Sequence, residues 1–206
     1  MSNAKNPHLS FFNDDVKIVN RKTVYSGFAK VEQLTIQHRL FEDQSFSQPI
    51  QRELVNRPEA AGVLLYDSKQ QLFGLIEQFR IGAVDDKNSA WQLEVVAGLV
   101  EQGDTPEQTV IREAVEEAGV DIKNPQLLYS FYPSAGACNE LFHLYVADTQ
   151  LSHTNQIFGV LGEAENIKLH VLKYDQLSQL LSNPHYLQNG PVIIALQWLQ
   201  RQLEHE

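Results

Sequence analysis

Alternation of apolar and polar side chains dominates the first quarter of the chain. β-Branched and aromatic residues alternate with polar ones over 16–20, 22–25, 30–40 and 51–56. This alternation predicts strands with one buried face, and Gly27 predicts a turn or bulge between two of them. We therefore expect residues 13–57 to form a small antiparallel sheet. Because such a sheet is marginally stable alone, it should pack on the main domain or on another subunit.

From residue 58 onward the pattern mixes strands with helices. Apolar runs predict strands at 60–66 and 71–79, joined by a turn at Asp67-Ser68-Lys69, and at 91–96, 126–132, 141–147 and 167–171. Helical periodicity is found at 106–118, 175–181 and 191–203. The polar stretch 148–166 shows no periodicity, which is typical of a functional or disordered loop. The pattern predicts an α/β (α+β) domain over 58–206, preceded by the sheet of 13–57.

The helix at 106–118 has clear ends. Thr105 is a good N-cap, Pro106 suits the first helical position, and Gln108 completes a capping box. Gly119 follows the last turn, where a left-handed residue is expected to end the helix.

The same helix separates apolar from charged residues. At 100° per residue, one face collects Val110, Ile111, Ala114, Val115 and Ala118, and the opposite face collects Arg112, Glu113, Glu116 and Glu117. Three carboxylates within one turn repel each other, and a divalent cation such as Mg²⁺ or Mn²⁺ would convert that repulsion into binding energy. An ordinary solvated acidic face is the alternative, and the helix alone leaves both open.

Composition narrows the class of protein. Of the 206 residues 43% are hydrophobic and 20% charged, as expected for a folded globular chain. The net charge of −10 argues against a surface that coats nucleic acid. No apolar run is long enough to span a membrane, and the first residues lack the apolar centre of a signal peptide. Cys138 is the single cysteine, which excludes an internal disulfide. We therefore expect a cytoplasmic protein with no membrane or nucleic-acid partner.

The stretch 98–120, GLVEQGDTPEQTVIREAVEEAGV, resembles the Nudix box. Eight of its positions match the box in register: Gly98, Arg112, Glu113, Ala114, Glu116, Glu117, Gly119 and Val120. Asp104 departs from it, standing where the family has its first glutamate. The segments EQFRIGAV, WQLEVVAGLVE and VIIALQWLQRQ, and YSGF followed by QHRLF, resemble the ADP-ribose pyrophosphatase branch of this superfamily. The similarity covers about residues 13–203.

The resemblance implies a fold, an activity and an assembly. The fold would be the Nudix α/β/α sandwich with a mixed sheet. The activity would be Mg²⁺-dependent hydrolysis of ADP-ribose to AMP and ribose 5-phosphate, with two or three ions and Mn²⁺ as an alternative metal. The assembly would be a homodimer that exchanges its N-terminal sheets across a two-fold axis.

The resemblance also implies roles for individual residues. The metal ligands would be the Ala97 carbonyl, Glu113, Glu117 and Glu165, with Glu116 a weaker candidate that braces Arg112. Glu163 would be the general base, and Arg80 would contact phosphate or ribose oxygens. Phe28, Arg52 and Arg57 would hold the adenine end. From the residues alone, Phe28 is a core or rim aromatic, the arginines at 52 and 57 are solvated, and Glu163 and Glu165 belong to an exposed acidic loop.

Two further readings stay open. One keeps the chemistry and changes the substrate, to another nucleoside diphosphate sugar of the GDP-mannose type or to a dinucleotide such as NADH. It is favoured by Ser134-Ala135-Gly136, which stands where the branch has Ser-Pro-Gly. The other is a non-catalytic nucleotide-sensing module on the same fold. Such modules usually lose the carboxylates of the box, whereas Glu113, Glu116 and Glu117 are all present here.

Overall fold

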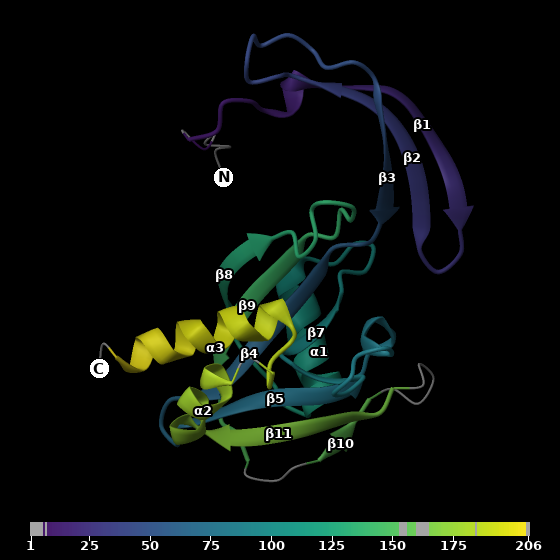
Figure 1. The fold of residues 1–206 in the computed structure, drawn as a ribbon. Coiled ribbons are helices and arrows are strands. Elements are labelled where there is room, and N and C mark those ends of the chain that lie inside the picture. Colours follow the sequence, from purple (N-terminus) through teal and green to yellow (C-terminus); the bar gives the residue numbers. More distant parts are fainter. Residues whose placement is uncertain (1–5, 7, 153–155, 160–164, 184, 205–206) are drawn as a thin grey trace. The chain divides into compact units, whose positions relative to one another are not determined.

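The chain forms two compact units in the computed structural model, which describes residues 6, 8–152, 156–159, 165–183 and 185–204 (Figure 1). The first unit contains residues 1–57 together with Ser134–Glu140. The second contains Pro58–Pro133 and Leu141–Glu206. The segment 134–140 groups with the first unit because its backbone pairs with β3: Val55 N–H donates to the Ala137 carbonyl at 2.8 Å.

The first unit is an antiparallel sheet of three strands in the order β1-β2-β3, preceded by a 3₁₀ turn at Asn13–Asp15. Its strands are β1 (Val16–Ser26), β2 (Lys30–His38) and β3 (Ile50–Asn56). Two separate strands were expected within 16–25, and this was wrong. The chain stays paired with β2 throughout, and shifts of register at Ile18/Asn20 and Thr23/Tyr25 absorb the irregularity.

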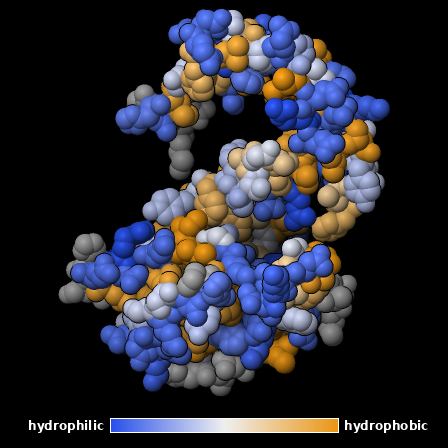
Figure 2. All heavy atoms as spheres, in the orientation of Figure 1, coloured by the Kyte–Doolittle hydropathy of each residue, from blue (hydrophilic) through white to orange (hydrophobic). Residues whose placement is uncertain are grey.

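β1 is solvent-exposed along its whole length. Its exposed residues include large apolar ones: Val16, Ile18, Val19, Val24 and Tyr25. Figure 2 shows hydrophobic and hydrophilic residues intermixed over this unit. Inside the sheet, buried Glu32 pairs with Arg21 at 2.7 Å and with Lys30 at 2.8 Å. A sheet of one layer thus keeps few apolar side chains away from water.

The second unit is built on an eight-stranded sheet in the order β10-β11-β5-β4-β9-β8, with β6 paired to β5 and β7 to β4. The strands are β4 (Ala60–Asp67), β5 (Leu72–Phe79), β6 (Trp91–Glu94), β7 (Val96–Leu99), β8 (Gln126–Phe131), β9 (Phe142–Asp148), β10 (Ile157–Phe158) and β11 (Ile167–Lys173). β4 and β9 are parallel and the other pairs are antiparallel, so the sheet is mixed.

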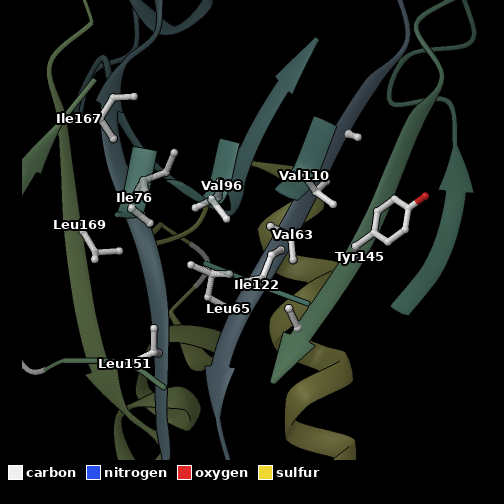
Figure 3. Packing of buried hydrophobic residues seen from close by; sticks show 14 of the residues in the cluster. Val63, Leu65, Ile76, Val96, Val110, Ile122, Tyr145, Leu151, Ile167 and Leu169 are labelled. Atoms are coloured by element: carbon white, nitrogen blue, oxygen red, sulfur yellow. The ribbon is translucent and has the colours of Figure 1, made fainter. Parts of the chain in front are cut away.

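Helices cover both faces of this sheet (Figure 1). They are α1 (Pro106–Ala118) on one face, and α2 (Leu177–Ser182) and α3 (Gly190–Leu203) on the other. Successive residues of β4 serve the two faces in turn: Val63 and Leu65 pack with Val110 of α1 (Figure 3), whereas Leu64 packs against α3. Short 3₁₀ turns lie at Ile81–Ala83 and Tyr174–Gln176. The predicted α/β/α sandwich with a mixed sheet is confirmed.

The predicted ends of α1 are confirmed. Thr105 caps the helix by accepting from the Gln108 N–H at 3.2 Å, and the Thr105 N–H donates to the Gln108 side chain at 2.8 Å. Gly119 ends it with φ +63°. Among the described residues, no helix is long and apolar enough to cross a membrane.

Within the stretch 148–166, the structure describes residues 148–152, 156–159 and 165–166, and some of these have defined contacts. Leu151 is fully buried, and its N–H donates to Asp67 at 3.1 Å. Ile157 and Phe158 form β10 and pair with β11. The sequence shows no periodicity here because these apolar residues are few and are separated by polar ones.

Candidate active site

The acidic side of α1 is not a solvated face. Glu113 is 9% and Glu117 3% exposed, whereas Val115 is 50% exposed. The helical projection grouped Val115 with the buried apolar residues, and its exposure is the point at which that grouping was wrong. The helix packs close to β7 and turns these two carboxylates toward that strand.

Two backbone features of β7 make this close packing possible. The Ala97 N–H donates to Oε2 of Glu117 at 2.9 Å. Gly98 leaves room for the other carboxylate, because a Cβ at this position would overlap the Glu113 side chain. The glycine of the stretch that resembles the Nudix box thus lies where the backbone of β7 and the Glu113 side chain come too close for any other residue.

Arg112 braces this cluster from the side. Its Nη1 donates to Glu113 at 2.8 Å and to Glu116 at 2.9 Å, and its Nη2 lies 3.7 Å from Glu101. Glu116 thus forms an ion pair with Arg112, which lies one turn earlier in the helix. Arg112 relieves part of the repulsion among these carboxylates by pairing with Glu113 and Glu116. It makes no such pair with Glu117.

The electrostatic balance of the cluster favours bound protons or cations. Burial raises the pKa of Glu117 to about 8, and repulsion from Glu113 and Glu165 contributes to the increase. Burial also raises the pKa of Glu113, and the neighbouring Arg112 only partly opposes this. Carboxyl groups with raised pKa values lack compensating positive charge.

Arg80 lies in the same electrostatic environment. It forms a two-pronged contact with Glu94, from Nε at 3.0 Å and from Nη2 at 2.7 Å. Burial would lower the pKa of Arg80, but its bonds to Glu94 and its attraction to Glu117 and Glu165 raise it. Its guanidinium is therefore positively charged and fixed in direction.

Glu94 was missed from the sequence. It lies in β6 and is only 4% exposed, so it is an acid on a buried strand face. The signal was present, because a single carboxylate within the apolar run WQLEVV needs a cationic partner if that run is buried. That partner is Arg80.

Glu165 lies close enough to affect Glu113, Glu117 and Arg80. A side chain at Gly159, whose φ is +115°, would collide with the Glu165 backbone and Cβ. The expected general base, Glu163, lies outside the described residues. Four of the expected residues, Arg80, Glu113, Glu117 and Glu165, thus form one neighbourhood beside Ala97.

The donor set fits a hard divalent cation. It contains carboxylate oxygens and a backbone segment, which Mg²⁺ and Mn²⁺ prefer to sulfur or imidazole ligands. Within the part of the chain that the structure describes, no three acidic, histidine or cysteine side chains are gathered tightly enough to form a ready-made metal site.

The three residues expected at the adenine end belong to the first unit. Phe28 is 92% exposed, and the guanidinium of Arg57 lies 5.6 Å from its ring centroid. Arg57 also pairs with Glu140 at 3.2 Å. Arg52, in β3, donates to the Gln51 carbonyl at 2.7 Å. The structure brings Phe28 and Arg57 together within this unit.

Comparison with known proteins decides the family. The NUDIX domain model matches residues 56–195. The chain belongs to the Nudix family. This Nudix protein is 36% identical over 193 residues to the ADP-ribose pyrophosphatase of Haemophilus influenzae, covering 92% of the chain and 88% of the relative. It is also 36% identical over 206 residues to the ADP-ribose pyrophosphatase of Escherichia coli K12, covering 100% and 97%.

A second group of relatives consists of GDP-mannose pyrophosphatases. The GDP-mannose pyrophosphatase of Escherichia coli strain 536 is 31% identical over 150 residues, covering 72% of this Nudix protein and 77% of the relative. The similarity to the Escherichia coli ADP-ribose pyrophosphatase covers 100% of the chain and so includes the N-terminal sheet. The resemblance to the ADP-ribose pyrophosphatase branch is therefore confirmed.

Proposed function

We propose that this protein is a Mg²⁺-dependent hydrolase that cleaves the diphosphate of ADP-ribose to AMP and ribose 5-phosphate. The observation that carries the proposal is the buried pair Glu113 and Glu117, with raised pKa values, beside Glu165 and Arg80. The relatives named ADP-ribose pyrophosphatase, similar along the whole chain, support this choice of substrate.

Glu113, Glu117, Glu165 and the carbonyl of Ala97 would hold the metal, two or three Mg²⁺ ions or Mn²⁺ in their place. When bound, the metal neutralises the diphosphate and activates water. Glu117 is oriented by the Ala97 N–H, and Glu113 by Arg112, so these oxygens are directed before ligand arrives. Glu116 has the supporting role of holding Arg112.

The remaining roles concern the proton and the substrate. Glu163 would take the proton from the attacking water. Arg80 would bind phosphate or ribose oxygens, in an orientation held by Glu94. Phe28, Arg52 and Arg57 would hold the adenine, Phe28 by stacking and the arginines by their planar cationic groups. Positive charge supplied locally lets a chain of net charge −10 bind an anion.

We further propose a cytoplasmic homodimer in which the sheets of residues 13–57 are exchanged, with the Nudix domain at 58–206. The exposed apolar residues of β1 support a second copy as the partner, because a single-layer sheet leaves them in water. No role for nucleic acid or membrane is proposed.

A panel of substrates tests the function. With Mg²⁺ present, AMP release from ADP-ribose should exceed release of the nucleoside monophosphate from GDP-mannose, ADP-glucose and NADH by at least about tenfold in kcat/KM. The GDP-mannose pyrophosphatase relatives and Ala135 make GDP-mannose the second candidate substrate. Comparable turnover of GDP-mannose would reject the ADP-ribose assignment. Binding of ADP-ribose without any turnover would favour the nucleotide-sensing module.

A further inference from the structure

A cavity of about 390 Å³ lies in the second unit, on the face of the sheet that carries α2 and α3. Its walls come from β5, β6 and the loop between them, β11, α2 and the loop before α3: Glu77, Asn88, Ser89, Trp91, Gln92, Leu93, His170, Leu172, Leu180, His185, Tyr186 and Gln188. None of these residues has a role in the proposed hydrolysis. Leu93, Leu172 and Leu180 belong to the apolar cluster around α3, whereas α1 packs on the other cluster.

Two aromatic side chains line the cavity. Trp91 is 56% and Tyr186 50% exposed, so part of each ring is accessible to a ligand. Trp91 is held by Phe79 in an edge-to-face contact with the ring centroids 5.6 Å apart. A fixed, half-exposed indole beside an apolar floor offers a flat surface on which a planar ring can stack.

Hydrogen bonds hold the polar part of the wall in place. The Gln92 amide donates to the side-chain oxygen of Gln188 at 3.1 Å, and Gln188 in turn donates to Asp86 at 3.2 Å. On another side, Nε2 of His170 lies 2.7 Å from Oε2 of Glu77. Apolar pockets with a few fixed polar groups are the usual form of a small-molecule site, and the volume lies near the lower end of their range of roughly 300–1,000 Å³.

The charge of the lining restricts the ligand. None of the lining residues, all within the described part of the chain, is Lys or Arg, and the one carboxylate, Glu77, is paired with His170. A phosphate group would therefore meet no permanently cationic side chain among these residues. A flat, uncharged ring with donor and acceptor edges suits both the aromatic walls and the polar groups.

We propose that this cavity binds an uncharged nitrogen heterocycle of nucleoside size, without phosphate, stacked against Trp91 and Tyr186. This goes beyond the proposed hydrolysis, since it gives the protein a second ligand site on the opposite face of the sheet. Adenosine is a suitable probe. AMP is the matched ligand that differs by one phosphate, and ribose 5-phosphate lacks the base.

Trp91 supplies its own signal. Trp198 is the other tryptophan, and it packs on Tyr66 in the core, so Trp198→Phe leaves Trp91 as the single reporter. In this background, without metal, adenosine should change Trp91 emission in a saturable way. AMP should bind at least about tenfold more weakly, and ribose 5-phosphate should have no effect. Tyr186→Ala should weaken adenosine binding at least about fivefold, because loss of one stacking partner is typically worth that much.

Tyr129→Ala is the matched control, since Tyr129 is 48% exposed on β8 and does not line the cavity. It should bind adenosine as the Trp198→Phe parent does. Tyr186→Ala should hydrolyse ADP-ribose at the parental rate. The proposal is overturned if adenosine gives no saturable change, if AMP binds as tightly, or if Tyr186→Ala binds as the parent does. It is also overturned if Trp91 emission depends on protein concentration alone, which would make a second copy the occupant.

Discussion

At the residue scale, burial separates acids that the sequence presents as equivalent. Glu113, Glu116 and Glu117 share one side of α1, yet Glu117 is 3% exposed and accepts from Ala97, whereas Glu116 pairs with Arg112 nearer the surface. The proposed metal therefore depends most on Glu117. This carboxylate is buried, has a pKa of about 8 and has no cationic side chain as a direct hydrogen-bond partner among the described residues.

Glu117→Gln should reduce Mg²⁺-dependent hydrolysis at least about 100-fold, because even groups that only orient metal ligands are worth 10–100-fold. Folding should survive, since the amide oxygen still accepts from Ala97 and a buried charge is removed. Steady-state rates across a Mg²⁺ titration and a thermal melt measure the two effects. Glu107→Gln, an exposed acid in the first turn of the same helix, is the control and should keep full activity. Wild-type turnover by Glu117→Gln would refute the metal assignment.

A second residue-scale prediction concerns Glu94, which holds Arg80 through a two-pronged contact. Glu94→Gln removes the charge and keeps one acceptor, so Arg80 should lose its fixed direction. We expect KM for ADP-ribose to rise about tenfold, which corresponds to about 1.4 kcal/mol, with a smaller change in kcat. Exposed Glu107→Gln serves as the control here too. An unchanged KM would show that Arg80 does not bind the substrate, or does not need Glu94 to do so.

These residues also show what the sequence could and could not supply. The residues of the Nudix box could be recognised in the sequence because the motif requires particular residue types at fixed spacings. The exposure of Val115 was not readable, because a helical projection assumes that the apolar side is the buried side. Here α1 packs on β7 through carboxylates, in space left by Gly98. The pairing of Glu94 with a cationic side chain could have been predicted, because Glu94 is a single acid within an apolar strand.

At the element scale, the β4–β5 turn does more than reverse the chain. Asp67 accepts from the Lys69 and Gln70 N–H groups at 3.1 and 2.9 Å, and from Leu151 N–H at 3.1 Å. It thereby ties the segment after β9 to the hairpin and places Leu151 in the core. The sequence predicted this turn. It did not predict the hydrogen bond between Asp67 and Leu151, because the two residues are 84 positions apart and no local pattern marks the contact.

Asp67 makes stability depend on pH in a defined direction. Burial alone would raise its pKa, but the hydrogen bonds from Gln70, Leu151 and Lys69 outweigh it and lower the pKa below the ordinary value of 3.8. The stabilisation is thus fully present above the unfolded-state pKa and is lost as pH falls through the lower folded-state pKa. Asp67→Asn should lower the free energy of unfolding by about 1–3 kcal/mol at pH 7.

Urea unfolding of Asp67→Asn and the parent at pH 7, 5 and 3 measures this effect. The difference between them should be the same at pH 7 and 5 and should narrow only at pH 3. The control is Asp121→Asn, at an exposed position just after α1. A difference that already narrows between pH 7 and 5 would contradict the lowered pKa.

At the scale of the whole molecule, the two units differ in how they bury apolar surface. The second unit has two separate clusters, one on each face of its sheet. In the first unit every residue of β1 is exposed, and Leu34 of β2, 8% exposed, is its one buried large apolar side chain among the described residues. Alternation in the sequence predicted strands in the first unit, and apolar runs predicted strands in the second. The sequence pattern could not show what covers the first unit, because alternation shows that one face of a strand is apolar but not which surface packs against it.

The proposed exchange of N-terminal sheets makes the first unit necessary for assembly. The full chain should be a dimer by light scattering at micromolar concentration. Ile18→Lys, which places a charge on the exposed apolar strand, should shift it toward monomer. Because Phe28, Arg52 and Arg57 belong to this unit, the monomer should also show a higher KM for ADP-ribose. Lys17→Ala, one position away on the same strand, should stay dimeric. Removal of residues 1–57 should give monomer or insoluble protein, and a soluble, fully active monomer would defeat the exchanged-sheet proposal.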